Sequence, residues 1–351
     1  MKNLLKKTLL LLLTLTLLTA CSMGDSPTTG SENTSVPVPE NTTLSSEETV
    51  SDTHYPVTIT NYNYAGEEVT TTYEKAPEKV LAVYQGSIET MIALGLEDHV
   101  VASYGLDNEV KEEWKDGLSK MHYDESVFAP DKETVTAMAP DMILSWGSIF
   151  SDKKLGDVAQ WEAKGTHCYM NTNTRPGGYP RTIENECQDL LNIGKIFNVE
   201  DKAQELVNEM QAEIDKALTE TEGKDQQSVA VIELWDDAYS NYGASSLAGD
   251  MVTQLGGELV FPDSSQISKE DLVIANPDVI FVVYMPKDND IMASGQEKVA
   301  AITEDPALSS LSAVQNQRVF PVMLGDVYAS TVRTIDGLKT MSHALYPELN
   351  K

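Results

Sequence analysis

Short apolar runs alternate with amphipathic segments from about residue 80 onward, a pattern that predicts strands and helices taking turns. Continuous apolar runs between helices favour parallel strands that are buried on both faces. In the first half, the predicted strands are 80–83, 100–102 and 142–146, and the predicted helices are 87–94, with Ser87 as N-cap, and 132–138. In the second half, the predicted strands are 229–234 and 279–283, and the predicted helices are 246–255 and 269–275.

One stretch of the first half recurs in the second half. Residues 133–144 and 270–281 both read as an acid, an apolar helix of two turns, Pro-Asp and a buried strand. This repeat predicts two similar α/β lobes with mainly parallel sheets. Between them, apolar residues at helical spacing over 199–222 predict a helix of about 22 residues, which spans roughly 33 Å and can bridge the lobes. Before the first lobe, β-rich stretches at 57–59 and 69–73 predict a hairpin.

The N-terminus has the pattern of a secretion signal. Lys2, Lys6 and Lys7 precede an apolar run at 9–18, which is shorter than the roughly 20 apolar residues of a membrane span. The run ends in Leu-Thr-Ala-Cys21, which resembles the lipobox of bacterial lipoproteins. We therefore expect residues 1–20 to be a signal peptide and Cys21 to carry lipid. Residues 21–53 are Ser, Thr, Pro, Gly, Asn and Glu-rich, which predicts a tether, and the protein is expected outside the cytoplasm on the bacterial cell membrane.

Composition narrows the possible partners. The chain has 351 residues, with 55 acidic and 25 basic side chains and a formal net charge of −30. Such a surface repels nucleic acid and anionic lipid headgroups, so the predicted membrane contact is the N-terminal lipid alone. The remaining cysteines, Cys168 and Cys187, have no spacing that demands a disulfide, and their pairing stays open.

The ordered series of these features resembles the iron-siderophore and vitamin B12 class of ABC transporter substrate-binding proteins, the class III periplasmic binding fold. The opening is carried by 55–60, 77–83 and 87–95, and the series continues through both repeated stretches and the bridging helix to Pro347. The resemblance implies a domain over about 78–348. Its predicted parts are a first lobe at 54–198, a bridging helix at 199–222 and a second lobe at 223–351.

The resemblance also implies function. One acid on each lobe would dock onto permease arginines, a role that falls on Glu133 and Glu270. A carboxylate at a helix start is exposed and can accept a bidentate Arg, although each acid is equally suited to favouring its helix dipole. The partners would be a permease dimer with its ATPase, and the binding protein itself would be a monomer. No cofactor is implied.

Candidate ligand-binding side chains follow the predicted strands, where open α/β sheets expose their loops. Aromatic side chains suit a large, partly apolar ligand, although each single ring is as compatible with core packing. The candidates are Tyr84, Tyr104 and Trp146 in the first lobe and Trp235, Tyr242, Tyr284 and Asp326 in the second, with Tyr239 and Tyr328 in comparable places. Of these, Tyr104, Trp146, Trp235 and Asp326 fall where the family's cleft residues usually lie. The cations that would face an anionic ferric siderophore are Arg175, Arg181 and Arg333.

Direct metal binding is not expected, because the five histidines are scattered and only His167-Cys168 are adjacent. The leading hypothesis is capture of a ferric siderophore or similar iron chelate. Cobalamin is the nearest alternative, weakened because Val127 and Ser264 stand where cobalamin binders of this family tend to carry Trp, and heme held by a Tyr stays possible. An adhesin or sensor would not need the paired acids, and a hydrolase lacks a nucleophile elbow or HExxH motif, so the chain is not expected to be an enzyme.

Overall fold

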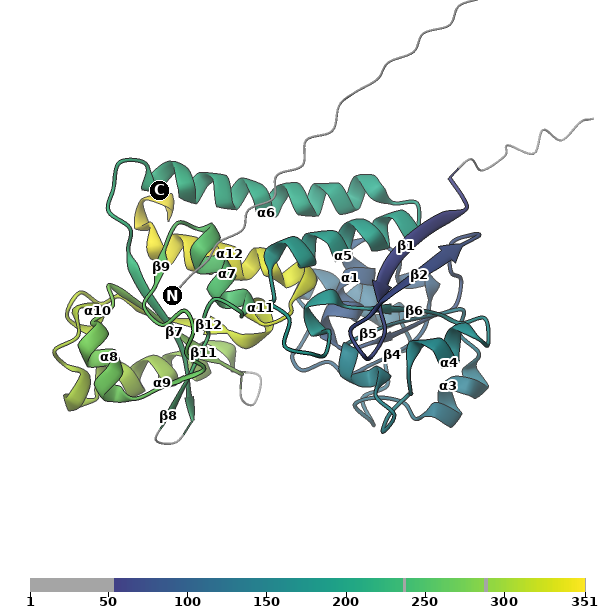
Figure 1. Ribbon diagram of the computed structural model, residues 1–351, viewed down its shortest axis with the longest axis horizontal. Helices are drawn as coiled ribbons and strands as arrows, with labels where there is room; N and C mark the ends of the chain where they lie inside the picture. The colour runs from purple at the N-terminus through teal and green to yellow at the C-terminus, as the bar shows by residue number, and fades with distance from the viewer. Residues whose placement is uncertain (1–53, 236–237, 287–289, 351) are drawn as a thin grey trace, which may run out of the picture. The chain divides into compact units, whose positions relative to one another are not determined.

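The computed structural model describes residues 54–235, 238–286 and 290–350, apart from the side chain of Asn350 (Figure 1). The predicted hairpin is present as antiparallel β1 (Val57–Tyr62) and β2 (Glu68–Tyr73), in register from Val57 opposite Tyr73 to Tyr62 opposite Glu68. The predicted Cys21 lipid site, signal peptide and tether lie outside the described residues. Within the described residues, no helix is both long and apolar enough to cross a bilayer.

The first lobe is built on a four-stranded parallel sheet with the order β4-β3-β5-β6. Its strands are β3 (Val80–Val83), β4 (Val100–Tyr104), β5 (Met142–Ser145) and β6 (His167–Met170). Its helices are α1 (Gln85–Ala93), α2 (Lys115–Lys120), α3 (Lys132–Met138) and α4 (Val158–Glu162). Val80 and Ala82 enter one core and Leu81 and Val83 another, so both faces of the sheet are covered, as continuous apolar strands require.

The second lobe has a mixed sheet with the order β10-β8-β7-β11-β12, and β9 also pairs with β7. The parallel centre is β7 (Ser228–Trp235), β11 (Val279–Tyr284) and β12 (Val319–Met323). The smaller strands are β8 (Ala238–Asn241), β9 (Glu258–Leu259) and β10 (Gln266–Ile267). The helices are α7 (Leu247–Gln254), α8 (Lys269–Ala275), α9 (Ile291–Thr303), α10 (Ser312–Gln315), α11 (Leu324–Val327) and α12 (Thr334–Leu345).

Two helices, rather than one, pack into the cores of both lobes. The predicted bridging helix is α6 (Glu200–Thr221), which lies beside α5 (Ile183–Ile196) and α12 (Figure 1). Ala203 of α6 belongs to a first-lobe core, whereas Met210 belongs to the second-lobe core. In α5 the order is reversed, because Ile183 packs with the second lobe and Ile193 with the first. The lobes are therefore joined by a paired-helix brace.

One predicted detail is wrong. Ser87 was expected to cap α1, but the helix begins at Gln85 with Tyr84 as its N-cap residue. Ser87 lies inside the first turn, fully buried, and its hydroxyl donates to Asn171 at 2.9 Å. The reason is that β3 passes into α1 through the single residue Tyr84, so the helix starts before the first side chain suited to capping.

Cys168 and Cys187, the cysteines among the described residues, are unpaired. Cys168 is buried in β6 and Cys187 is half-buried on α5, where its sulfur lies 3.9 Å from that of Met210. Burial raises the pKa of both thiols, which keeps them protonated and unreactive. The limits predicted for the two lobes and the bridging segment stay predictions. Helices α5 and α6 pack into cores of both lobes, so no single residue marks a boundary between them.

Candidate functional site

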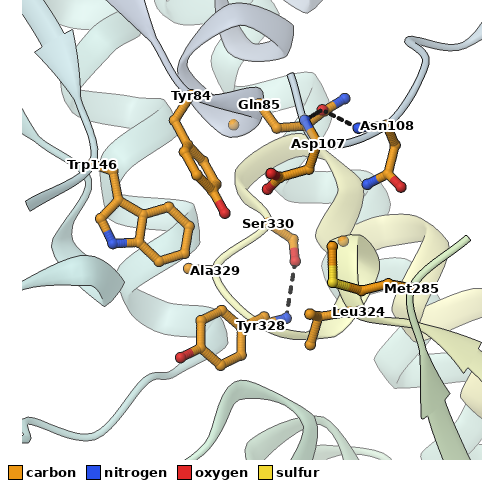
Figure 2. Close-up of a pocket in the computed structure, with 12 residues that line it drawn as sticks. Tyr84, Gln85, Asp107, Asn108, Trp146, Met285, Leu324, Tyr328, Ala329 and Ser330 are labelled. Atoms are coloured by element: carbon orange, nitrogen blue, oxygen red, sulfur yellow. Dashed lines mark hydrogen bonds between the residues drawn. The ribbon is translucent and has the colours of Figure 1, made fainter. Parts of the chain in front are cut away.

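A pocket with an open volume of about 160 Å³ lies between the lobes (Figure 2). The first lobe contributes residues that follow β3, β4 and β5, and the second lobe contributes residues that follow β11 and β12. Its wall consists of Tyr84, Gln85, Gly86, Asp107, Asn108, Trp146, Met285, Leu324, Gly325, Tyr328, Ala329 and Ser330. A volume below the roughly 300–1,000 Å³ of ordinary ligand pockets means that a bulky ligand has to separate the side chains that now touch across it.

The first-lobe wall is made by the carboxyl ends of neighbouring strands. Tyr84 follows β3 and Trp146 follows β5, which pair in parallel, so both side chains leave the same edge of the sheet. Their ring centroids are 4.1 Å apart. Tyr84 has φ 83° and ψ 155°, a backbone conformation that residues other than Gly seldom adopt. Strain of this kind is concentrated at functional sites, which supports this pocket as the site.

A chain of aromatic rings crosses from one lobe to the other. Phe128 meets Tyr84 edge-on at 5.5 Å, and Trp146 stacks on Tyr328 of the second lobe with centroids 5.9 Å apart and planes 19° apart. Tyr328 in turn meets Tyr242 edge-on at 6.5 Å. Figure 2 shows the rings of Trp146, Tyr84 and Tyr328 turned toward the same space. These faces can cover a large apolar ligand at a small cost in side-chain entropy.

The second-lobe wall is anchored to first-lobe carboxylates. Arg333, in a short 3₁₀ turn after Tyr328, donates through Nε and Nη2 to the two oxygens of Glu89, each at 2.6 Å. Both side chains are buried, and although burial opposes the guanidinium charge, the hydrogen bonds and charge of Glu89 raise the pKa of Arg333. Glu186 of α5 accepts the backbone N–H groups of Ser330 at 3.1 Å and Thr331 at 2.7 Å. The segment 328–333 is therefore held in place by the first lobe.

Gln85 connects this anchor to the remaining wall. Its Nε2 donates to Glu89 at 2.6 Å, and its Oε1 accepts the backbone N–H groups of Asp107 at 3.0 Å and Asn108 at 3.1 Å. The amide thus fixes the loop after β4. Burial, followed by the neighbouring Asp107 carboxylate, raises the pKa of the Tyr84 phenol. In Figure 2, the carboxylate of Asp107 is turned toward Tyr84.

Of the predicted ligand-binding side chains, the structure brings three aromatic residues together. Tyr84 and Trp146 form the pocket wall, and Tyr242 reaches it through Tyr328. The hydroxyl of Tyr242 donates to Glu233 at 2.8 Å, which, after burial, contributes to raising the pKa of Tyr242. Their roles in ligand binding stay predictions.

Other predicted aromatic and acidic residues lie outside the wall. Tyr104 and Tyr284 are the last residues of β4 and β11 and are buried. Asp326 is also buried, with its Oδ1 3.8 Å from Nη1 of Arg333 and without a hydrogen bond. Burial raises the pKa of Asp326 to about 7. Trp235 is 61% exposed at the end of β7, next to residues that are not described.

The three predicted cations have different environments. Arg333 is tied to Glu89, as described above. Arg175 lies between two rings, with its guanidinium carbon 4.0 Å from the ring centroid of Tyr62 and 3.5 Å from that of Tyr179. Arg181 alone touches a wall residue, because its guanidinium carbon lies 3.7 Å from the ring centroid of Tyr328.

Sequence reasoning missed several wall residues. Asp107 and Asn108 lie in a polar loop after β4, and Gln85 lies between the predicted strand 80–83 and the predicted helix 87–94, so none carried a periodic signal. Met285 comes two residues after the predicted strand 279–283, but the candidates named there were aromatic, acidic and basic side chains. The same rule would have found it had apolar side chains been included.

The paired acids occupy matching places. Glu133 is in the first turn of α3 and Glu270 is in the first turn of α8, and both are exposed. Among the described residues, no group of three His, Cys, Asp or Glu side chains is arranged to hold a metal ion. The pocket wall offers aromatic rings and separate polar side chains to a ligand.

Comparison with known proteins places this architecture. The model of the periplasmic binding protein family matches residues 80–322. The uncharacterized ABC transporter substrate-binding lipoprotein YvrC of Bacillus subtilis is 25% identical over 307 residues, which cover 85% of this chain and 88% of that protein. The petrobactin-binding protein YclQ of the same organism is 27% identical, over 70% of this chain and 74% of that protein.

A crystal structure of a periplasmic binding protein from Veillonella parvula superposes with a TM-score of 0.79. It is 31% identical, over 84% of this chain and 93% of that one. The predicted fold, two α/β lobes joined by a long helix, is confirmed, and so is the resemblance on which the sequence interpretation depended. This chain belongs to the periplasmic binding protein family, a family of binding proteins rather than of enzymes.

Proposed function

We propose that this chain captures a ferric siderophore or similar iron chelate between its lobes and delivers it to an ABC importer. The observation that carries the proposal is the ring-lined pocket, in which first-lobe Tyr84 and Trp146 face second-lobe Tyr328. A relative of 27% identity is a petrobactin-binding protein, which favours an iron chelate over other bulky ligands. Cobalamin and heme are the competing cargoes within the same importer class.

The mechanism follows from the contacts across the pocket. A chelate that enters between Trp146 and Tyr328 replaces their ring contact at 5.9 Å with two ring–ligand contacts. Apolar parts of the ligand leave water, which is favourable in proportion to the area buried. Because 328–333 is anchored by Glu89 and Glu186, the space arises from side-chain movement and limited lobe opening rather than from detachment of that wall.

Delivery requires a fixed docking surface and a fixed location. Glu133 and Glu270 each start a helix on a different lobe, so a permease with two suitably spaced arginines reads the separation of the lobes. Lipid on Cys21 would hold the protein, as a monomer, beside the permease on the outer face of the cell membrane. The similar YvrC protein is a substrate-binding lipoprotein, which supports this localisation.

Intrinsic tryptophan fluorescence tests the proposed cargo. The full chain, purified in mild detergent, is titrated separately with ferric hydroxamate and catecholate siderophores, heme and cobalamin. We expect saturable quenching by at least one ferric siderophore, because Trp146 is in the pocket wall. The Trp146→Phe variant is expected to lose most of the signal, and the matched Trp114→Phe variant to keep it, since Trp114 packs against the cores outside the wall.

Each outcome of the titration has a defined meaning. Flat curves with all ferric siderophores would overturn the proposed cargo, and saturation by cobalamin or heme alone would replace it. Quenching that persists at full amplitude in Trp146→Phe would place the ligand outside this pocket.

A further inference from the structure

The pocket wall carries a single formal charge, and that charge is negative. Among the described wall residues, Asp107 is the one acidic side chain, and none is Lys or Arg. The neighbouring pocket on the same side is lined by Asp107, Asn108, Glu109, Pro286 and Ile291, which adds a second carboxylate at the mouth. A negatively charged ligand therefore meets like charge at this end of the site.

The cations nearest the pocket are already engaged by the protein. Arg333 has a bidentate hydrogen bond with Glu89, so its charge is neutralised inside the fold. Arg181 covers the Tyr328 ring and donates to the Tyr328 carbonyl at 3.4 Å. Glu233 accepts the hydroxyl of Tyr242, the ring that meets Tyr328 edge-on. The charge of Arg333 is therefore not available to an anionic chelate, and Arg181 lies against the face of the Tyr328 ring.

The charge on Asp107 is held in a defined position. Gln85 fixes the loop backbone by accepting the N–H groups of Asp107 and Asn108, and both Asp107 and Tyr84 line the pocket. Figure 2 shows the Asp107 carboxylate turned toward Tyr84, and a carboxylate has several lone pairs that can accept hydrogen bonds. The ring faces beside it also favour positive charge, because aromatic faces are negative. A positioned carboxylate and aromatic ring faces together form a site that suits a cation or N–H donors.

We propose that the pocket selects ferric chelates without negative net charge, above all ferric hydroxamates with an ammonium group that pairs with Asp107. This inference rests on the proposed function. A ferric tris-hydroxamate is neutral at its metal centre, whereas a ferric tris-catecholate carries three negative charges. Bringing those charges beside Asp107 is unfavourable, while an ammonium group gains a charge-assisted hydrogen bond.

One chelate with three different tails separates charge from shape. The probes are ferrioxamine B, which has a terminal ammonium group, its N-acetyl form, which is neutral, and its N-succinyl form, which ends in a carboxylate. We expect affinity for the full chain to fall in that order, by at least about tenfold from first to last. Raising the salt concentration is expected to reduce the difference, because screening weakens exposed charge pairs.

A matched pair of variants locates the effect. Asp107→Asn keeps the shape of the side chain and removes its charge, so the preference for the ammonium form over the acetyl form should shrink several-fold. Asp98→Asn, an exposed change at a side chain that is 83% exposed in the same lobe, should leave the whole series unchanged.

The outcomes keep this inference apart from the proposed function. Equal affinities for the three tails, tighter binding of the succinyl form or of a ferric tris-catecholate, or an unchanged series in Asp107→Asn would each overturn the charge selection while leaving iron-chelate capture standing. Failure of every ferric chelate, the catecholate included, to quench the fluorescence would instead remove the proposed function.

Discussion

The segments that begin at α3 and α8 have the same construction in the two lobes. Each helix has a side-chain cap, Asp131 in the first lobe and Ser268 in the second, and each ends in a left-handed residue, Ala139 or Asn276. Pro-Asp follows, and the Asp carboxylate accepts backbone N–H groups at or just before the start of the neighbouring strand. The repeat thus fixes where helix and strand lie relative to each other.

The two segments differ where they meet the pocket. β5 has four residues and is followed by Trp146, whereas β11 has six residues and is followed by Met285. Two further residues of strand carry the second-lobe chain past the position that Trp146 occupies in the first. The repeated frame consists of the helix cap, the helix and the Pro-Asp pair, and it orients the proposed docking acids in both lobes. The strand ends that face the pocket are not repeated. Frame and ligand site can therefore be disturbed independently.

The largest effect is expected from the repeated acids. Replacing both Glu133 and Glu270 with Lys should abolish uptake of radioactive iron chelate by cells, because two attractive contacts with permease cations become repulsive. Ligand affinity, measured by fluorescence, should not change, since neither acid lines the pocket.

The control for this experiment changes an equally exposed acid on each lobe. Glu113→Lys with Glu304→Lys alters net charge by the same amount outside the first turns of α3 and α8 and should preserve uptake. Equal loss of uptake in the control, or loss of ligand affinity in the test variant, would contradict the docking role.

The next effect concerns the joint between the lobes, which has no repeated counterpart. Arg333→Met leaves Glu89 buried without its cation, and such a change typically costs about 3–5 kcal/mol of unfolding free energy. Denaturant unfolding measures the loss. The double variant Glu89→Met with Arg333→Met removes both charges and should recover much of it. A double variant as unstable as the single one would show that the hydrogen bonds to Gln85 and Glu109, rather than charge, matter most.

A smaller effect is expected from pH at Asp326. Because burial raises its pKa from 3.8 to about 7, the folded protein binds a proton that the unfolded chain has already released above about pH 4. This carboxyl therefore contributes stability at low pH and loses it as the pH rises toward 7, with an effect on the order of 2 kcal/mol between about pH 5 and pH 7.

The neutral variant isolates this group. Asp326→Asn should flatten that part of the pH–stability curve and stabilise the protein at neutral pH. Asp189 provides the comparison, since burial also raises its pKa to about 7 but Tyr169 and Thr172 donate to it. Asp189→Asn should destabilise the protein instead. An unchanged slope in Asp326→Asn would show that this carboxyl is ionised throughout.

The repeated Pro-Asp carboxylates should have comparable, smaller effects. Asp141 accepts the N–H groups of Glu78 and Lys79, each at 2.8 Å, and Asp278 accepts the N–H of Ser228 at 2.9 Å and its hydroxyl at 2.7 Å. Replacing either Asp with Ala should cost about 1–2 kcal/mol in thermal or denaturant unfolding. Asp278 should show the lower value, since it is more exposed. A large loss of stability in one lobe alone would show that the two segments share their structure but do not contribute equally to stability.

The sequence predicted this frame well because its signals are local. α3 and α8 match their predicted limits, since caps and Pro-Asp punctuate the chain on both sides. β8 and β10 were missed because strands of four and two residues exist only through pairing with each other and with β7. Helices α5 and α9 and strand β12 were also not predicted.

The pocket was predicted less completely than the frame. The end of a strand gives the approximate position of a side chain but not the direction in which that side chain points. Trp146 comes after the last residue of its strand and faces the pocket, whereas Tyr104 and Tyr284 are the last residues of their strands and turn into the lobes. Successive side chains of a strand point to opposite faces. An error of one residue in the predicted end of a strand therefore changes whether a side chain is expected to face the pocket or the interior of the lobe. Asp107 is positioned by Gln85, a long-range contact without a local signal.

The smallest effect lies at the one residue where the repeated frame is imperfect. Ala139 has φ 47°, a left-handed conformation that disfavours a Cβ atom, whereas the second lobe uses Asn276 with φ 44°. The side chain of Asn276 also exchanges hydrogen bonds with Ser312, both at 2.8 Å. Ala139→Gly should therefore stabilise the protein by up to about 1 kcal/mol in thermal unfolding. Ala137→Gly, inside α3 and equally exposed, should destabilise it by about 0.5–1 kcal/mol, so effects of the same sign at both positions would mean that helix propensity, and not the left-handed cap, limits this end of the first lobe.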